Sequence, residues 1–395
     1  MQELNANWNY PTNIKAGAGR VHELPGLCRE MGMQSPLLVT DPGLAALPMI
    51  EQVMNELKSA GLSAGLFSAI KANPTGENVD EGVSFYRDMG HDGVIAFGGG
   101  SALDAAKAVA LMVGQDRCLW DFEDVGDNWT RVNVAGMAPV IALPTTAGTG
   151  SEVGRAAVIT EPKNHIKKII FHPGMLPAWV ILDPELTVGL PASLTAATGM
   201  DALSHNLEAL CSPFYHPMAE GIAVEGVSLV HRYLPRAVAD GRDMEARTQM
   251  LVCSSMGATA FQKGLGAMHA LAHPLGALYD AHHGTLNAIL MPYVLKANRN
   301  AIEEKITRLS RYLGLTTAGF DGFLDWVIEL RAQLGIPDTL AMINIDDSDS
   351  ETVGKMAVAD PSAGGNPISF SSEQYQRIFQ AAVAGQLQHS VTDTP

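Results

Sequence analysis

The chain has 395 residues, more than a single hydrophobic core usually supports, so we expect two domains. Its net charge of −16 argues against nucleic acid or an anionic membrane as a partner. Four widely spaced cysteines, no apolar signal-peptide core and no long apolar run predict a cytoplasmic protein without a disulfide framework, a cysteine zinc site or a membrane span.

Short β-type runs alternate with helical stretches through the first half of the chain. Strands that alternate with helices of this length predict βαβ units and a mostly parallel sheet, that is, an α/β domain over residues 1–190. Ligands of such sheets bind beyond the carboxyl ends of the strands. The expected strands are Pro36–Thr40, Leu62–Phe67, Gly93–Phe97, Val140–Leu143 and Trp179–Leu182, and the expected helices are Met49–Gly61, Val79–Gly90 and Ser101–Val113.

The character of the sequence changes near Pro191, where the convincing β-type runs end. Apolar residues then recur at helical spacing, which predicts an all-helical domain over residues 191–395. The expected helices cover residues 193–210, 217–239, 243–261, 265–279, 301–313 and 319–335.

A glycine-rich turn, Gly98-Gly99-Gly100-Ser101, links an expected strand directly to an expected helix. Glycines let the backbone approach a diphosphate closely, and the helix N-terminus supplies N–H donors and a positive dipole. We expect Ser101 to be the N-cap, and Asp104, one turn further on, suits the same dipole. The turn matches neither G-x-G-x-x-G nor the P-loop pattern, and a tight turn that binds nothing is the alternative.

A second polar run, Pro144–Glu152, follows another expected strand. Its hydroxyls and glycines can wrap a ribose or a phosphate, or it is only a polar loop. Asp41, after the first expected strand, can accept hydrogen bonds from an adenine-ribose 2′-hydroxyl and would repel a 2′-phosphate, which favours NAD over NADP. A turn residue before Pro42 is the alternative for Asp41. The candidate cofactor residues of the run are Thr145, Thr146, Thr149 and Ser151.

The second half carries two polar pairs at helical spacing, Asp201 with His205 and His269 with His273, and then His282-His283. Residues four apart lie on one face of a helix, so each pair can direct both side chains to one point. A carboxylate with imidazoles suits Fe, Zn, Co or Ni, whereas Mg and Ca prefer oxygen ligands. The neighbouring residues are small and apolar, and buried polar groups need partners. The pattern therefore predicts a first-row metal site, with purely structural histidines as the alternative.

Together these motifs resemble the iron-containing (group III) alcohol dehydrogenase family, over essentially the whole chain. The matching stretches are Gly98-Gly-Gly-Ser101-x-x-Asp104, Leu143–Glu152, Thr198-Gly-Met-Asp201-Ala-Leu-Ser-His205, His269-x3-His273 and His283-Gly284. The fold of that family is similar to that of dehydroquinate synthase, which implies a dinucleotide-binding α/β domain over residues 1–190 and a helical metal-binding domain over residues 191–395.

The resemblance also implies roles for individual residues. His273 becomes an active-site histidine near the nicotinamide, Lys168 a lysine near the cofactor, and Asn73 a residue that lines the nucleotide cleft. The family habit also implies a homodimer or higher homo-oligomer. The implied ligands of Fe(II), with Zn as a possible substitute, are Asp201, His205, His269 and His283.

The implied function is reversible hydride transfer between NAD and a small primary alcohol or aldehyde, with the metal as Lewis acid. Arg155 and Lys263 add the hypothesis of an anionic substrate, such as a hydroxy acid or a sulfonate or phosphonate aldehyde, unless both are solvated surface residues. Phe261 is a candidate substrate contact in a segment that is one residue shorter than the family pattern. The alternatives are a non-redox metal lyase of the dehydroquinate synthase-like type and a non-catalytic nucleotide or metal binder.

Overall fold

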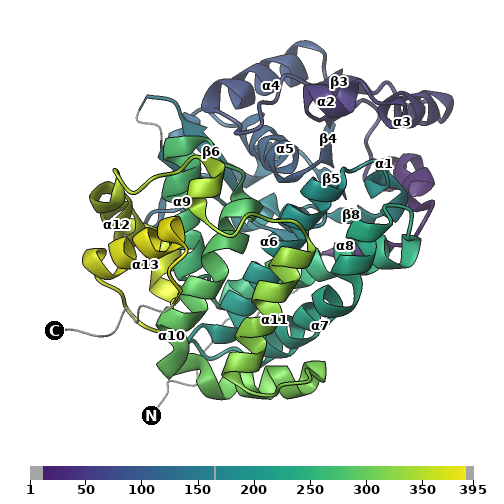
Figure 1. Ribbon diagram of the computed structural model, residues 1–395. Helices are drawn as coiled ribbons and strands as arrows, with labels where there is room; N and C mark the ends of the chain where they lie inside the picture. Colours follow the sequence, from purple (N-terminus) through teal and green to yellow (C-terminus); the bar gives the residue numbers. More distant parts are fainter. Residues whose placement is uncertain (1–11, 164–165, 388–395) are drawn as a thin grey trace. The chain divides into compact units, whose positions relative to one another are not determined.

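The structure is a computed structural model that describes residues 12–163 and 166–387 (Figure 1). The chain divides into two compact units between Leu190 and Pro191. Below, the sheet unit comprises the described residues up to 190, and the helical unit comprises residues 191–387.

A six-stranded parallel sheet in the order β1-β8-β5-β4-β2-β3 forms the centre of the sheet unit. The predicted α/β fold with a mostly parallel sheet is therefore confirmed. In the register, Pro36 of β2 lies opposite Gly93 of β4, and Gly98 of β4 lies opposite Pro144 of β5. The strands are β1 (Asn13–Ala16), β2 (Pro36–Val39), β3 (Gly65–Phe67), β4 (Gly93–Gly98), β5 (Val140–Pro144) and β8 (Trp179–Leu182).

Both faces of the sheet are covered, which explains why its central strands are almost uniformly apolar. Ile95 and Phe97 of β4 belong to a core shared with α1 and α3. Val94 and Ala96 alternate with them and are also fully buried, on the side where α5 packs against the strands and α4 packs against α5. The helices of this unit are α1 (Leu24–Glu30), α2 (Pro42–Ala45), α3 (Pro48–Ser59), α4 (Gly76–Asp88) and α5 (Gly100–Met112).

Three strands of the sheet unit are absent from the expected set. β1 pairs in parallel with β8 at the edge of the sheet. β6 (Ala156–Glu161) and β7 (Ile166–Phe171) form a separate antiparallel pair. Ala156 and Ala157 in β6 and Lys167 and Lys168 in β7 are residue types that strands usually lack, so neither segment was expected to be a strand.

The helical unit contains helices only, within the residues described from 191 to 387. α6 packs against α7, α8 and α10, and α10 also packs against α9 and α11 (Figure 1). Two features differ from the expected helices. The helix expected over residues 301–313 begins already at His283, and two further helices, α12 and α13, follow the last expected one. The helices are α6 (Ala192–Cys211), α7 (Pro217–Ala239), α8 (Met244–Ala260), α9 (Ala267–Tyr279), α10 (His283–Leu313), α11 (Phe320–Gln333), α12 (Ser350–Ala359) and α13 (Ser372–Ala384).

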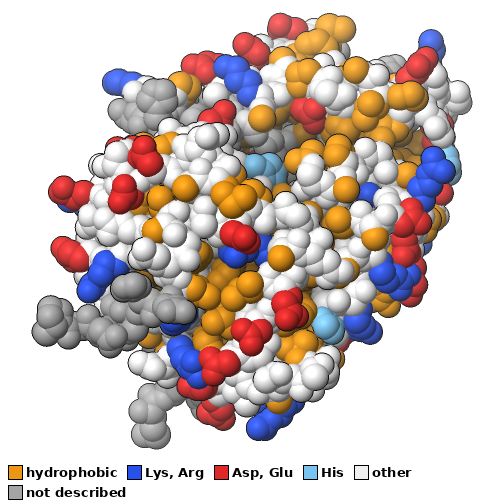
Figure 2. All heavy atoms as spheres, viewed as in Figure 1, with side chains coloured by type: hydrophobic (Ala, Val, Ile, Leu, Met, Phe, Trp, Pro, Cys, Tyr) orange, Lys and Arg blue, Asp and Glu red, His pale blue; other side chains and the backbone are white. Residues whose placement is uncertain are grey.

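Acidic and basic side chains are interspersed with apolar ones on the face of the molecule shown in Figure 2. The acidic excess of the sequence is therefore not gathered into one continuous patch on that face. In the part of the chain that the structure describes, no helix is both long enough and apolar enough to cross a bilayer.

The four cysteines are unpaired and differ sharply in exposure: Cys118 is exposed, and Cys28, Cys211 and Cys253 are buried. Burial raises the pKa of each of the three buried thiols to about 12, because it disfavours the thiolate. Since the thiolate is the nucleophile, we expect iodoacetamide at pH 8 to alkylate Cys118 alone in the native protein. Mass spectrometry should find one adduct before denaturation and four after it, and rapid labelling of two native thiols would contradict this.

Candidate metal site and nucleotide-binding loops

Three helices of the helical unit carry the predicted metal ligands. Asp201 and His205 are one turn apart on α6, His269 lies in the first turn of α9, and His283 is the first residue of α10. Gly284 explains how α10 reaches α6, because a Cβ at this position would lie 2.3 Å from the Ala197 carbonyl oxygen. In the His283-Gly284 pair, the histidine is the candidate ligand, and the glycine allows α10 to lie close enough to α6 to place that histidine.

The four predicted ligands converge. One candidate donor atom from each of Asp201, His205, His269 and His283 lies within 4.8 Å of the others. Asp201 Oδ1 is 3.5 Å from His283 Nε2 and 4.0 Å from His269 Nε2. The His205 and His269 rings stack with centroids 4.7 Å apart. The first three residues are buried, whereas 29% of the His283 side chain is exposed, so His283 forms the accessible edge of the cluster.

The electrostatics favour a cation at this point. Burial alone would raise the pKa of Asp201, but the charges of His205, His283 and His269 and a hydrogen bond from Asn287 lower it to about 2. Burial, together with the charge of His205, lowers the pKa of His269 well below its usual range. At neutral pH the cluster therefore presents one carboxylate and an uncharged imidazole of His269, both in the protonation state that binds metal.

Two further residues of the cluster were not predicted. Glu208 continues the α6 face of Asp201 and His205, and its Oε2 lies 2.6 Å from His269 Nδ1. Burial raises the pKa of Glu208 to about 7, although backbone N–H groups of Gly266 and Met268 oppose this. Asn287, one turn after His283, donates from Nδ2 to Asp201 Oδ1 at 2.9 Å. The sequence did carry a signal for both, because Glu208 lies three residues after His205 and Asn287 four residues after His283, on the same helix faces as these candidates.

The residues present fit a divalent transition metal. One carboxylate and three imidazoles form a suitable donor set. His205 Nδ1 and Asn287 Oδ1 are buried polar atoms without a hydrogen-bond partner in the described chain. Asn287 Nδ2 also lies 3.2 Å from both His269 Nε2 and His283 Nε2, so those two ring nitrogens face the same point.

His273 lies one turn after His269 on α9 and is bound differently. Its Nδ1 is 2.8 Å from Asp360 Oδ2, and its ring stacks on His283 with centroids 5.4 Å apart. Burial would raise the pKa of Asp360, but the hydrogen bond and charge of His273 and the bonds from Ser362 hold it below its usual value. With Nδ1 engaged by a carboxylate, Nε2 is the nitrogen left for other chemistry.

In the sheet unit, the glycine-rich turn joins β4 to α5. Gly98 has φ 147°, and a Cβ there would lie 2.7 Å from that of Ala102, so this position requires glycine. The prediction that Ser101 is the N-cap is wrong. Gly99 is the N-cap and makes no side-chain cap, and the Ser101 hydroxyl donates instead to the Ala72 carbonyl. β4 extends one residue further than expected, to Gly98, and α5 begins at Gly100, so the N-cap lies two residues before the predicted one.

The loops after β2, β4 and β5 lie at neighbouring carboxyl ends of the sheet. The chain turns from β2 to β3 on one side and from β4 to β5 on the other, which makes the β2/β4 boundary the switch point where such sheets bind ligands. Asp41 is the N-cap of α2 and accepts from Leu44 N at 3.0 Å, so the turn role of Asp41 is real. Thr145 is buried and its N–H donates to the Gly98 carbonyl, while Thr146 and Thr149 face Gly99 and Gly100.

Asp104 and Ser151 interact with each other. The Asp104 carboxylate accepts from the Ser151 hydroxyl and, at 2.9 Å, from Val158 N. Lys107, which the sequence analysis did not single out, lies 3.3 Å from Asp104 and donates to the carbonyls of Ser151 and Ala156. Together the three side chains hold the loop after β5 against α5, so Asp104 shapes the loop from within the protein.

We expect Lys107→Met to destabilise the sheet unit by about 1–3 kcal/mol, since it leaves the partly buried partners of a buried ammonium unpaired. Burial lowers the pKa of Lys107, whereas the charge of Asp104 and its hydrogen bond to Lys107 raise it, so Asp104 helps to keep the buried ammonium charged. Urea unfolding monitored by circular dichroism measures the change. Lys58→Met, at an exposed position of α3, is the control, and a loss below about 1 kcal/mol in Lys107→Met would contradict the prediction.

The remaining predicted cofactor residues occupy other parts of the sheet unit. Asn73 is partly buried in the connection between β3 and α4. Lys168 lies on β7, where its ammonium is 3.0 Å from Glu123 and 3.4 Å from Glu161. The hydrogen bond to Glu123 raises the pKa of Lys168.

The three candidate substrate residues have very different environments. Phe261, at the end of α8, packs its ring edge-on against His205 with centroids 5.1 Å apart. The Arg155 guanidinium is partly exposed and lies 5.7 Å from the Phe171 ring centroid. Lys263 is buried, and its ammonium donates to Glu220 at 2.8 Å and to the carbonyls of Leu210 and Ser212. The charge expected to face a substrate at Lys263 is thus used to cap the C-terminal end of α6.

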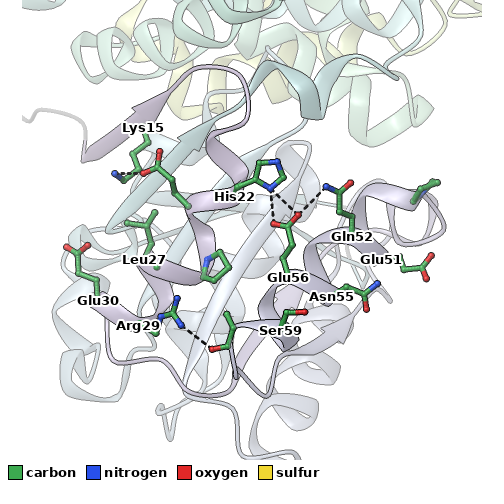
Figure 3. Close-up of a pocket in the computed structure, with 15 residues that line it drawn as sticks. Lys15, His22, Leu27, Arg29, Glu30, Glu51, Gln52, Asn55, Glu56 and Ser59 are labelled. Atoms are coloured by element: carbon green, nitrogen blue, oxygen red, sulfur yellow. Dashed lines mark hydrogen bonds and ion pairs between the residues drawn. The ribbon is translucent and has the colours of Figure 1, made fainter.

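A groove of about 1070 Å³ on the sheet unit lies away from the predicted residues, between the segment 15–30 and α3. Figure 3 shows His22 and Gln52 pointing at Glu56, whose carboxylate oxygens lie 3.0 Å from His22 Nδ1. Its lining carries both charge signs: Lys15 pairs with Glu23 and His22 with Glu56, and Arg29 donates to the Ala60 carbonyl.

A parallel sheet with a glycine-rich switch-point loop and a helical unit with an Asp/His cluster that could hold a metal are typical of a metal-dependent, nucleotide-using enzyme. The family model "Iron-containing alcohol dehydrogenase" matches residues 11–184, and "Fe-containing alcohol dehydrogenase family, C-terminal" matches residues 195–383. The chain belongs to the iron-containing alcohol dehydrogenase family and is an NAD-dependent enzyme of that family.

Relatives support this over the full length. A 4-hydroxybutyrate dehydrogenase of Cupriavidus necator is 38% identical over 384 residues, which cover 95% of this chain and 99% of the relative. The crystal structure of a 1,3-propanediol oxidoreductase superposes with a TM-score of 0.91 at 32% identity, over 95% of this chain and all of that one. A sulfoacetaldehyde reductase of Bifidobacterium kashiwanohense, solved in complex with NAD+, superposes with a TM-score of 0.87 at 28% identity. The match covers 96% of this chain and 100% of the reductase.

Proposed function

We propose that the enzyme transfers hydride reversibly between NAD and a short primary alcohol carrying a terminal anion, with ω-hydroxy acids as the first candidates. The convergence of Asp201, His205, His269 and His283 within 4.8 Å carries the catalytic part of the proposal. The names of two relatives, a 4-hydroxybutyrate dehydrogenase and a sulfoacetaldehyde reductase, support the anionic substrate. Family membership favours this oxidoreductase over the lyase and the non-catalytic binder.

The four ligands would hold Fe(II) or Zn, which would supply Lewis-acid polarisation of the substrate oxygen, and NAD would be the hydride acceptor. Asp201 keeps its negative charge down to low pH and sets the charge of the cage. His273, oriented by Asp360, offers Nε2 to accept the proton of the alcohol. Phe261 forms an apolar wall beside His205.

In the sheet unit, the proposed NAD site comprises the three loops at the β2/β4 switch point. The N-terminus of α5, which has no side-chain cap, and the backbone of Gly98–Ser101 would bind the diphosphate. Asp41 would bind the adenine ribose, and the loop with Thr145, Thr146, Thr149 and Ser151 would face the same ligand. Asn73 and Lys168 complete the proposed set.

Arg155 is the remaining candidate to recognise the anion. Among the described residues it has no carboxylate within ion-pair distance, and a guanidinium pairs well with carboxylate or sulfonate. Lys263 does not share this role in the proposal, because its buried ammonium already donates to Glu220 and to the carbonyls of Leu210 and Ser212.

Turnover of 4-hydroxybutyrate and 1-butanol, followed as NADH formation on protein of measured metal content, tests the proposal. We expect kcat/KM to favour 4-hydroxybutyrate by at least about tenfold, or ~1.4 kcal/mol, and Arg155→Ala to remove that preference while butanol turnover stays unchanged. Arg117→Ala, at an exposed position of the same unit, is the control. If kcat/KM is equal for the two alcohols and Arg155→Ala does not change this, the proposal of an anionic substrate is rejected. If no alcohol yields NADH, the proposed dehydrogenase activity is rejected as well.

A further inference from the structure

We infer that Glu208 is a positioning residue for the metal cage, which fixes His269 in the tautomer that presents a bare Nε2 to the metal. The inference rests on the proposed metal site and adds a residue outside the ligand set. A histidine binds metal through a nitrogen lone pair, and the hydrogen bond made by its other nitrogen decides which nitrogen carries the proton.

The two nitrogens of His269 face different partners. Nδ1 lies 2.6 Å from Glu208 Oε2, on the side away from the cage. Nε2 lies 4.0 Å from Asp201 Oδ1 and 3.2 Å from Asn287 Nδ2, on the cage side. A donor at Nδ1 and a lone pair at Nε2 satisfy both contacts, because Glu208 accepts and the Asn287 amide donates. The opposite tautomer would leave a ring N–H pointing at the amide N–H.

Glu208 is itself held rigidly. It is 4% exposed, Oε2 accepts from Gly266 N at 2.8 Å, and Oε1 accepts from Met268 N at 2.7 Å. Both oxygens thus accept N–H groups at the N-terminus of α9, one from its N-cap, Gly266, and one from its first turn, Met268. The carboxylate therefore joins α6 to the start of α9 and also orients the ring of His269.

His205 shows why this single contact matters. Its Nδ1 has no hydrogen-bond partner in the described chain. Its ring is held by stacking on His269, with an interplanar angle of 15°, and by the edge contact with Phe261. A rotation of His269 would therefore also release His205, so Glu208 positions two ligands through one hydrogen bond.

Co2+ affinity of the metal-stripped protein, measured from the visible ligand-field absorption in competition with a chelator, tests the role. We expect Glu208→Gln to raise the dissociation constant for Co2+ by about 10–100-fold, because an amide has one acceptor oxygen and cannot bind the N–H groups of Gly266, Met268 and His269 together. Asn366→Ala is the matched control. Asn366 Oδ1 accepts from Ala267 N at 3.1 Å, so that variant removes an acceptor from the same turn of α9 without touching His269.

The outcomes separate the possibilities. Unchanged Co2+ affinity in Glu208→Gln overturns the inference, and so does equal weakening in Asn366→Ala, which would assign the effect to helix capping. Failure of the unmutated protein to bind Co2+ would instead reject the metal site of the proposed function.

A measurement on the unmutated, metal-stripped protein covers the case in which Glu208→Gln does not fold. Histidine side-chain 15N NMR, with His269 assigned by loss of its signals in His269→Gln, should find the proton on Nδ1. A proton on Nε2 would overturn the inference.

Discussion

The His269→Ala variant is expected to lose bound metal and turnover together. His269 is 1% exposed and stands at the centre of the cluster, stacked on His205 and directed at Asp201. Without its imidazole the cage has three donors, and the ring that orients His205 is gone. We expect turnover to fall by at least about 1,000-fold, or ~4 kcal/mol in activation free energy. Metal analysis of the purified variant and NADH formation are the two measurements.

The same substitution also has a structural cost that the experiment must separate from catalysis. It leaves the Glu208 carboxylate buried without the ring N–H, which destabilises the fold by about 1–3 kcal/mol. His282→Ala is the matched control, because His282 is the exposed N-cap of α10 beside the cage and accepts from Thr285 N. That control should keep its metal and its turnover. A folded, metal-free His269→Ala protein with full turnover would refute the proposed chemistry.

The second large effect is expected from Gly99→Ala, which should weaken NAD binding without weakening the fold. Gly99 has φ −75° and ψ 179°, a conformation open to any residue. An added Cβ would lie 3.4 Å from Thr146 Cγ2, an ordinary van der Waals distance. If a diphosphate lies against this turn, the methyl group occupies its space, and we expect the dissociation constant of NAD to rise at least about tenfold, or ~1.4 kcal/mol.

Two further glycines make this test specific. Gly100→Ala would bring a Cβ within 2.5 Å of Thr149 Cγ2, so loss of binding there would mix steric damage with loss of the site. Gly26→Ala, on α1 with open space around it, should change neither stability nor NAD affinity. Titration calorimetry with NAD and thermal unfolding report both quantities. If the Gly99→Ala protein is stable and its NAD affinity is unchanged, the predicted diphosphate site is wrong and the glycines only form the turn.

The pattern of apolar residues along the chain predicted the bounds of the buried strands and of the core helix well. The apolar strands β2, β4 and β5 and the long helix α6 lie close to their expected bounds, because fully covered strands and core helices must be apolar. The β6–β7 pair was not predicted because Ala156 and Ala157 of β6 and Lys167 and Lys168 of β7 are residue types that strands usually lack. The start of α10 escaped because His282 caps it with an imidazole, a group that gives no recognisable capping motif.

By itself, the sequence determined the chemistry available to this enzyme. Residue type and spacing along one helix are local properties, so Asp201 with His205 predicted a metal-binding face, and the glycines at the end of β4 predicted a backbone that a ligand can approach. The tertiary structure decided how the other groups are used. It turns His273 toward Asp360, 87 residues away, joins Glu208 to His269 across two helices, and buries Lys263 against Glu220. These contacts join segments far apart in the chain, and only the packing of the helices brings them together.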